Sequence, residues 1–155
     1  MEDNLADIFI ILEKLHRTFL DLICVENDKK ALLLGEYKAE DLLPIISKEE
    51  FLAKKIAYTE KEIKDFFSEG EYKGCNITSL LNKNINNNEL HTKISTIQEH
   101  IHKCILEYSE IRTINDSILR TEASFYGYLF RKLYKSNTYS KDNKGHRVNT
   151  FNTVA

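Results

Sequence analysis

A seven-residue repeat of apolar side chains in the second half of the chain constrains the fold more than any other feature. Ten of thirteen positions taken at alternating steps of four and three residues are apolar, and the three polar ones lie in the C-terminal half. These positions are Leu90, Ile94, Ile97, Ile101, Cys104, Tyr108, Ile111, Asn115, Ile118, Glu122, Phe125, Leu129 and Lys132. Such a stripe is a seam for another helix, and its persistence predicts one helix over residues 89–135. That helix would be about 70 Å long.

The composition favours helices and a single domain. A chain of 155 residues is about one domain long, and it contains one proline, five glycines and no tryptophan. The 22 basic residues nearly balance the 24 acidic ones. We therefore expect no nucleic-acid partner, because sequence-independent binding needs a strong basic field.

Neither a signal peptide nor a membrane-spanning segment is expected. The first residues, Met1 to Asn4, lack the basic-then-apolar order of a signal peptide, and the chain has no run of 18 apolar residues. The three cysteines are widely spaced and form no Cys-x-x-Cys pair. This usage suits a reducing, cytoplasmic location better than a disulfide framework.

Two further amphipathic helices are predicted in the first half, over residues 4–34 and 43–67. Gly35 suits the end of the first helix, because glycine adopts the left-handed conformation at a helix terminus, and Pro44 suits the beginning of the second. Several seam positions in these helices are polar, and such residues usually fix the register or pair with a nearby lysine. They include Glu26, Lys29 and Glu49.

The sequence therefore predicts an all-α fold of three long antiparallel helices. The first two form a hairpin, and the third is coiled-coil-like and longer than its partners. Residues 70–88 are predicted as a loop with a short helix, because asparagine side chains compete for backbone hydrogen bonds. We expect a helical domain over residues 1–135 and a flexible polar tail over 136–155, where few apolar residues offset the ordering entropy.

Aromatic residues crowd the end of the third predicted helix. Two groups lie about 100° apart around this helix, so one partner helix cannot cover both. A wide apolar face of a helix bundle is one interpretation, and a surface that takes an amphipathic helix from another protein is the other. The residues of this predicted binding surface are Phe125, Tyr126, Leu129, Phe130 and Leu133.

No motif for catalysis, a cofactor or a metal stands out, and we expect the chain not to be an enzyme. His100 and Cys104 share a helix face, as two zinc ligands would, but the remaining candidates have no recognisable ligand spacing. Cys104 also lies on the apolar seam, where a thiol packs as a small hydrophobe. Nucleophile motifs and a phosphate-binding glycine loop are absent from the sequence. The glutamates on the apolar seams, Glu26, Glu49 and Glu122, have no histidine three residues later, as the Glu-x-x-His signature of carboxylate-bridged metals requires.

Two blocks of sequence resemble the FlgN family of flagellar export chaperones. The N-terminal block comprises residues 30–36 (KALLLGE), Leu42-Leu43 and residues 48–52 (KEEFL). The C-terminal block comprises residues 115–119 (NDSIL), an apolar helical stretch, and Thr138-Tyr139 followed by Gly145.

This resemblance implies a cytoplasmic chaperone that binds the C-terminal helical segment of hook-associated proteins (FlgK and FlgL) and delivers them to the export gate protein FlhA. By position, it adds Asn115, Ile118 and Leu119 to the client-binding surface and makes Tyr139 the residue that docks on the gate. The competing hypothesis from another class is a structural coiled-coil or adaptor protein that self-associates, for example as a homodimer, without an export role.

Overall fold

The computed structural model describes residues 2–83 and 88–142, and these residues are almost entirely helical with no strand among them. Three helices are long: α1 (Glu2–Leu33), α2 (Ala39–Phe66) and α4 (Asn88–Asp142). A 3₁₀ turn, η1 (Gly70–Tyr72), and a short helix, α3 (Ile77–Lys83), connect α2 to α4. The predicted all-α class is confirmed, with a fourth helix where the sequence predicts a short helical turn in a loop. No described helix has the length and apolarity to cross a membrane.

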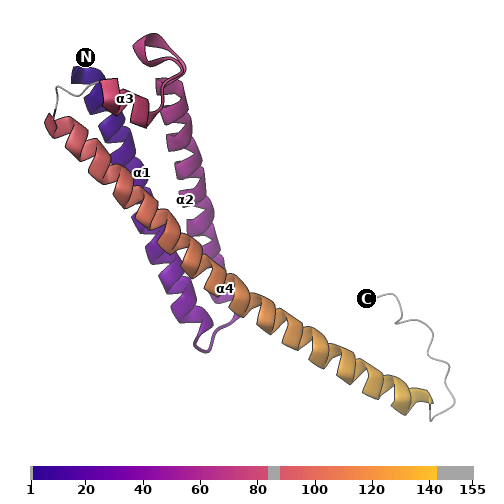
Figure 1. Cartoon of the computed structure of the whole chain (residues 1–155). Helices are drawn as coiled ribbons and strands as arrows, with labels where there is room; N and C mark the ends of the chain where they lie inside the picture. Colours follow the sequence, from indigo (N-terminus) through magenta and orange to yellow (C-terminus); the bar gives the residue numbers. More distant parts are fainter. Residues whose placement is uncertain (1, 84–87, 143–155) are drawn as a thin grey trace. The chain divides into compact units, whose positions relative to one another are not determined.

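The chain divides into two compact units, residues 1–115 and 116–155, and α4 belongs to both. In the first unit, α1 and α2 run in opposite directions as a hairpin, and the first part of α4 runs beside α1 (Figure 1). The apolar side chains at the heptad positions of α1 and α4 pack together in a core, and α3 covers one end of this core. Its buried residues are Leu5, Ile8, Leu12, Leu15, Tyr72, Leu80, Leu81, Ile94, Ile97 and Ile101.

Two smaller apolar clusters continue this core toward the connection between α1 and α2. Leu22 and Val25 of α1 pack with Leu52 of α2, while Ile23 of α1 packs with Cys104 and Ile111 of α4. Helix α1 therefore contacts α2 with one flank and α4 with the other. Each such buried aliphatic side chain contributes about 1.5–3 kcal/mol relative to an exposed one.

Helix α2 begins four residues earlier than predicted, at Ala39 instead of residue 43. The Asp41 carboxylate accepts a hydrogen bond from the Lys38 backbone N–H at 2.8 Å, which satisfies a donor at the helix start. Glu40 and Asp41 also place negative charge in the first turn, where the helix dipole favours it. Pro44 therefore lies inside the helix instead of at its beginning.

Two positive-φ glycines and an asparagine cap shape the connection from α2 to α4. Gly70 (φ 72°), the first residue of η1, and Gly74 (φ 75°), which follows η1, take the left-handed conformation, which residues with a Cβ rarely adopt. The Asn76 side chain then accepts a hydrogen bond from the Ser79 N–H at 2.8 Å and starts α3. This places Leu80 and Leu81 in the core.

Helix α4 ends at Asp142, seven residues beyond the predicted end at Lys135. The first part of the predicted flexible tail is therefore helical. The rest of that tail, residues 143–155, lies outside the described residues.

Candidate functional site

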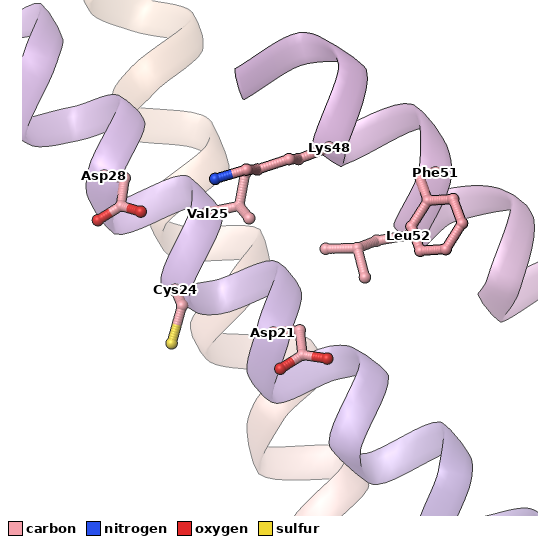
Figure 2. A pocket seen from close by; sticks show the side chains of 7 residues that line it. All are labelled: Asp21, Cys24, Val25, Asp28, Lys48, Phe51 and Leu52. Atoms are coloured by element: carbon pink, nitrogen blue, oxygen red, sulfur yellow. The ribbon is translucent and has the colours of Figure 1, made fainter. Parts of the chain in front are cut away.

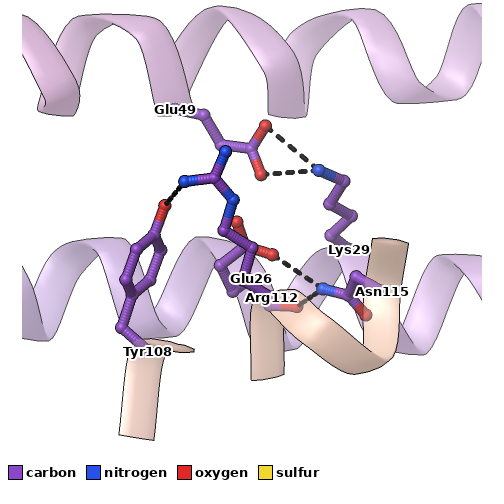
Figure 3. A network of polar contacts seen from close by, with 6 residues as sticks. All are labelled: Glu26, Lys29, Glu49, Tyr108, Arg112 and Asn115. Carbon is purple, nitrogen blue, oxygen red and sulfur yellow. Dashed lines mark hydrogen bonds and ion pairs between the residues drawn. The ribbon is translucent and has the colours of Figure 1, made fainter. Parts of the chain in front are cut away.

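A buried polar junction lies in the first unit, where α1, α2 and α4 meet (Figure 3). Asn115 of α4 is 0% exposed, and its Nδ2 donates to the Glu26 backbone carbonyl at 2.9 Å and to Glu26 Oε2 at 2.7 Å. Its Oδ1 is buried and accepts no hydrogen bond from the residues that the structure describes. Asn115 thus ties α4 to both the main chain and the side chain of α1.

An ion pair between α1 and α2 completes the junction. Lys29 Nζ lies 2.9 Å from Glu49 Oε1 and 3.2 Å from Oε2, with both side chains largely buried. Pairing with a nearby lysine is one of the two roles that the sequence suggests for a polar seam residue. Nearby on α4, Arg112 donates a hydrogen bond to the Tyr108 hydroxyl at 3.1 Å (Figure 3). The polar seam residues of three helices are therefore gathered into one layer.

Burial raises the pKa of the Glu26 carboxyl above its ordinary value, because only 2% of the residue is exposed. The Glu49 carboxyl raises the pKa further, through a side-chain hydrogen bond and through like charge. The hydrogen bond from Asn115 and the charge of Lys29 act in the opposite direction. The fold therefore disfavours the charged form of Glu26, while the neighbouring Glu49 pairs with Lys29.

Replacement of Glu26 by glutamine should remove a pH dependence from the stability of the chain. A carboxyl whose pKa is raised on folding contributes stability that is fully present below its unfolded value of about 4.5 and is lost as the pH rises through the folded value. At about pH 7, Glu26→Gln should be more stable than the wild type by on the order of 1 kcal/mol. Urea denaturation at about pH 4 and pH 7 measures the difference.

Glu99→Gln is the matched control, because it removes the same charge from an exposed position on α4. It should leave the pH profile of the wild type almost unchanged. If the free energy of unfolding of Glu26→Gln varies with pH in parallel with that of the wild type, then Glu26 is ionised in the fold without a loss of stability.

A shallow hollow of about 330 Å³ lies between α1 and α2. Figure 2 shows Lys48 reaching from α2 toward Val25 on α1, with Phe51 and Leu52 on the α2 wall. The lining combines two acids, one cation and apolar side chains: Asp21, Cys24, Val25, Asp28, Lys48, Phe51 and Leu52. No histidine is among these lining residues, so the Cys24 thiol has no histidine beside it in the hollow.

The histidine and cysteine weighed as metal ligands have other surroundings in the fold. The His100 ring of α4 lies tilted by 35° against the His16 ring of α1, with ring centroids 5.5 Å apart, and Cys104 is buried in the apolar cluster with Ile23. Burial first, and then the His100 charge, lower the pKa of His16 and favour its neutral form. Within residues 2–83 and 88–142, no group of three or more His, Cys, Asp or Glu side chains is arranged to hold a metal.

An exposed apolar surface lies on α4 in the second unit. Among the described side chains after Asn115, none is buried. The exposed apolar residues range from 38% exposed at Leu129 to 67% at Tyr126. We call this surface the aromatic stripe; it comprises Phe125, Tyr126, Leu129, Phe130 and Leu133, and spans about 140° of the helix circumference at 100° per residue.

Two rings and a cation add detail to this surface. Phe125 and Tyr126 meet edge to face with centroids 5.9 Å apart, and Lys132 Nζ lies 5.3 Å from the Tyr128 ring centroid. Contiguous exposed apolar surface of this kind commonly marks a protein or membrane contact.

The predicted client-binding residues therefore fall into three groups. Five of them form the aromatic stripe, while Ile118 and Leu119 are half-buried one to two turns earlier. Asn115 is enclosed in the polar junction and presents no surface to a partner. Tyr139 lies within α4, but its side chain is outside the described residues.

Glu26 is the junction residue that the sequence did not single out as a partner of Asn115. Each occupies a polar position on an apolar seam, and that was the available signal.

No protein-family model, curated protein or solved structure matches this chain.

Proposed function

We propose that this chain is a helix-binding chaperone whose client docks on the aromatic stripe of α4. The observation that carries the proposal is the stripe itself, a row of large apolar side chains left exposed on a continuous helix. Each anchor that a partner buries would contribute on the order of 1.5–3 kcal/mol. Several together exceed the few kcal/mol that ordering a flexible client segment costs.

An amphipathic helix is the client element that fits this surface. The stripe is straight, apolar and too wide for a single coiled-coil seam, so it offers anchor positions at helical spacing. Binding of such a helix to the aromatic stripe needs no ATP and no catalytic group. Release requires only a competitor for the surface or unfolding of the client.

The resemblance to the FlgN family supplies the biological setting of the proposal. In that setting the clients are hook-associated proteins of the FlgK and FlgL kind, whose terminal helices are kept unassembled in the cytoplasm. The chaperone then delivers them to the export gate protein FlhA. Ile118 and Leu119 would extend the client surface toward the first unit.

Affinity purification of the tagged full-length chain from its native cells tests the proposal most directly. Mass spectrometry of the bound proteins should identify a hook-associated protein, and deletion of that protein's terminal helix should abolish the complex. A client that still binds after this deletion would contradict docking of an amphipathic helix. Recovery of partners unrelated to the flagellum would contradict the export setting.

Tyr139→Ala should separate delivery from client binding. If the Tyr139 ring docks on the export gate, its loss should weaken gate binding about tenfold, as expected for one buried aromatic anchor. Client affinity and the thermal midpoint should stay unchanged. Calorimetric titration with the gate domain, together with a secretion assay, measures both effects.

Tyr58→Ala is a matched control, because Tyr58 is an exposed tyrosine on α2 of the first unit. It should affect neither gate binding nor secretion. Normal gate affinity of Tyr139→Ala would remove Tyr139 from the docking surface.

A further inference from the structure

Four seam residues of α4, two of which belong to the aromatic stripe, are symmetric about Gly127. Phe125 and Leu129 lie two residues on either side of it, and Glu122 and Lys132 lie five residues on either side. The steps between the four seam residues are three, four and three residues, and this order is the same in both directions. A helix that runs antiparallel to α4 and carries the same four residues would therefore present the same seam.

The chemistry of these positions is also matched to an inverted copy. With two copies antiparallel about Gly127, each Phe125 lies opposite the partner subunit's Leu129, and each Glu122 lies opposite the partner subunit's Lys132. The apolar pair forms the middle layers of the interface, and two ion pairs close its ends. In a parallel arrangement in register, Glu122 would face Glu122 and Lys132 would face Lys132, and like charges in facing positions are destabilising.

We propose that the aromatic stripe of α4 pairs with a second copy of this chain as an antiparallel coiled coil centred on Gly127. The helix is long enough for this pairing, because every seam residue from Ile118 to Lys132 lies within α4. Gly127 itself lies about 160–200° from Phe125 and Leu129 around the helix, so it is outside the interface. Glu122 is half-buried and Leu129 is 38% exposed, which leaves both side chains accessible to a partner helix.

The second copy would cover Phe125 and Leu129, two of the residues on which a client helix would dock. Self-pairing and client binding would then exclude each other, so the homodimer would protect these two residues until a client arrives. This consequence rests on the proposed function; the homodimer itself does not.

Charge exchange tests both the dimer and its direction. Sedimentation equilibrium of the full-length chain should give a mass that rises with concentration from 18.1 kDa to that of a dimer. Glu122→Lys alone, or Lys132→Glu alone, places like charges opposite each other at two points and should raise the dimer Kd roughly tenfold. The double variant Glu122→Lys/Lys132→Glu restores both ion pairs and should return the Kd to near the wild-type value.

The double variant also separates the two directions. In a parallel dimer each position faces the same position of the partner, so like charges face each other in the wild type and in every variant. The two single variants would then dimerise no more weakly than the wild type or the double variant. Circular dichroism and thermal melting should confirm that all four proteins keep the same helical content.

A chain that stays monomeric at every concentration would overturn the proposal and leave the stripe to a foreign helix or a lipid surface. Single variants that dimerise as tightly as the wild type, or a double variant that fails to recover, would overturn the antiparallel register. Neither outcome touches the proposed function, because client binding by a monomer is measured separately.

Discussion

Replacement of Asn115 by alanine should lower the free energy of unfolding by about 3 kcal/mol. The side chain is fully enclosed and is the donor for both the Glu26 backbone carbonyl and the Glu26 carboxyl. Alanine would leave these two acceptors buried without that donor, and would also open a cavity between α1 and α4. Both effects act on the folded state, and neither acts on the unfolded chain. Urea denaturation followed by circular dichroism measures the loss.

Thr113→Ala is the matched control on the same helix. The Thr113 hydroxyl is exposed and bonds only to its own helix, at the Ser109 carbonyl. Its removal should change stability by less than about 0.5 kcal/mol. A loss below about 1 kcal/mol for Asn115→Ala would show that water replaces the amide and that the junction is not dry.

Combining Asn115→Ala with Glu26→Gln would show how far the two residues act as one unit. The double variant should lose less stability than the sum of the single effects predicts, because the uncharged amide introduced by Glu26→Gln needs the Asn115 donor less than a carboxylate does. Additive effects would mean that the amide supports α4 mainly through the Glu26 backbone carbonyl.

The long helices were predictable because their signal is local and repeated. Each of α1, α2 and α4 carries apolar residues at steps of three and four, and this periodicity alone identifies a helix and its buried face. Burial of Ile8, Ile94 and Leu52 on those faces agrees with the seams read from the sequence.

The helix ends depended on local chemistry that periodicity does not report. The Asp41 carboxylate starts α2 ahead of Pro44, although proline favours the first helical turn. At the other end, α4 continues through polar residues to Asp142 despite their low helix propensity.

The polar junction was only partly predictable, since the pairing of polar seam residues depends on how three helices align. The sequence indicates that a polar seam residue such as Glu49 fixes the register or pairs with a nearby lysine, and in the fold it pairs with Lys29. It does not indicate that Asn115 faces Glu26, because the vertical alignment of α4 against α1 is set by the packing of distant core residues. Asn115 was therefore assigned to the client surface by position, whereas the fold uses it internally.

Phe125→Ala combined with Leu129→Ala should weaken client binding by about 3 kcal/mol, roughly a hundredfold in Kd. Both side chains lie on the aromatic stripe and are 57% and 38% exposed, so the folded chain alone gains little from them. The free energy of unfolding should change by less than about 0.5 kcal/mol. Titration of a client-derived helical peptide into the full-length variant measures the affinity, and urea denaturation measures the stability.

Ile105→Ala combined with Leu106→Ala is the matched control for this experiment. These residues are also exposed apolar side chains of α4, but they lie in the first unit, outside the stripe. The control should bind the client as tightly as the wild type does. If the Phe125/Leu129 variant also loses self-pairing, more of its surface is available to the client, and this would strengthen client binding. A measured loss of client affinity therefore cannot result from the loss of self-pairing. If the variant instead unfolds, and its remaining folded fraction binds the client normally, the stripe is a structural face and the client surface lies elsewhere.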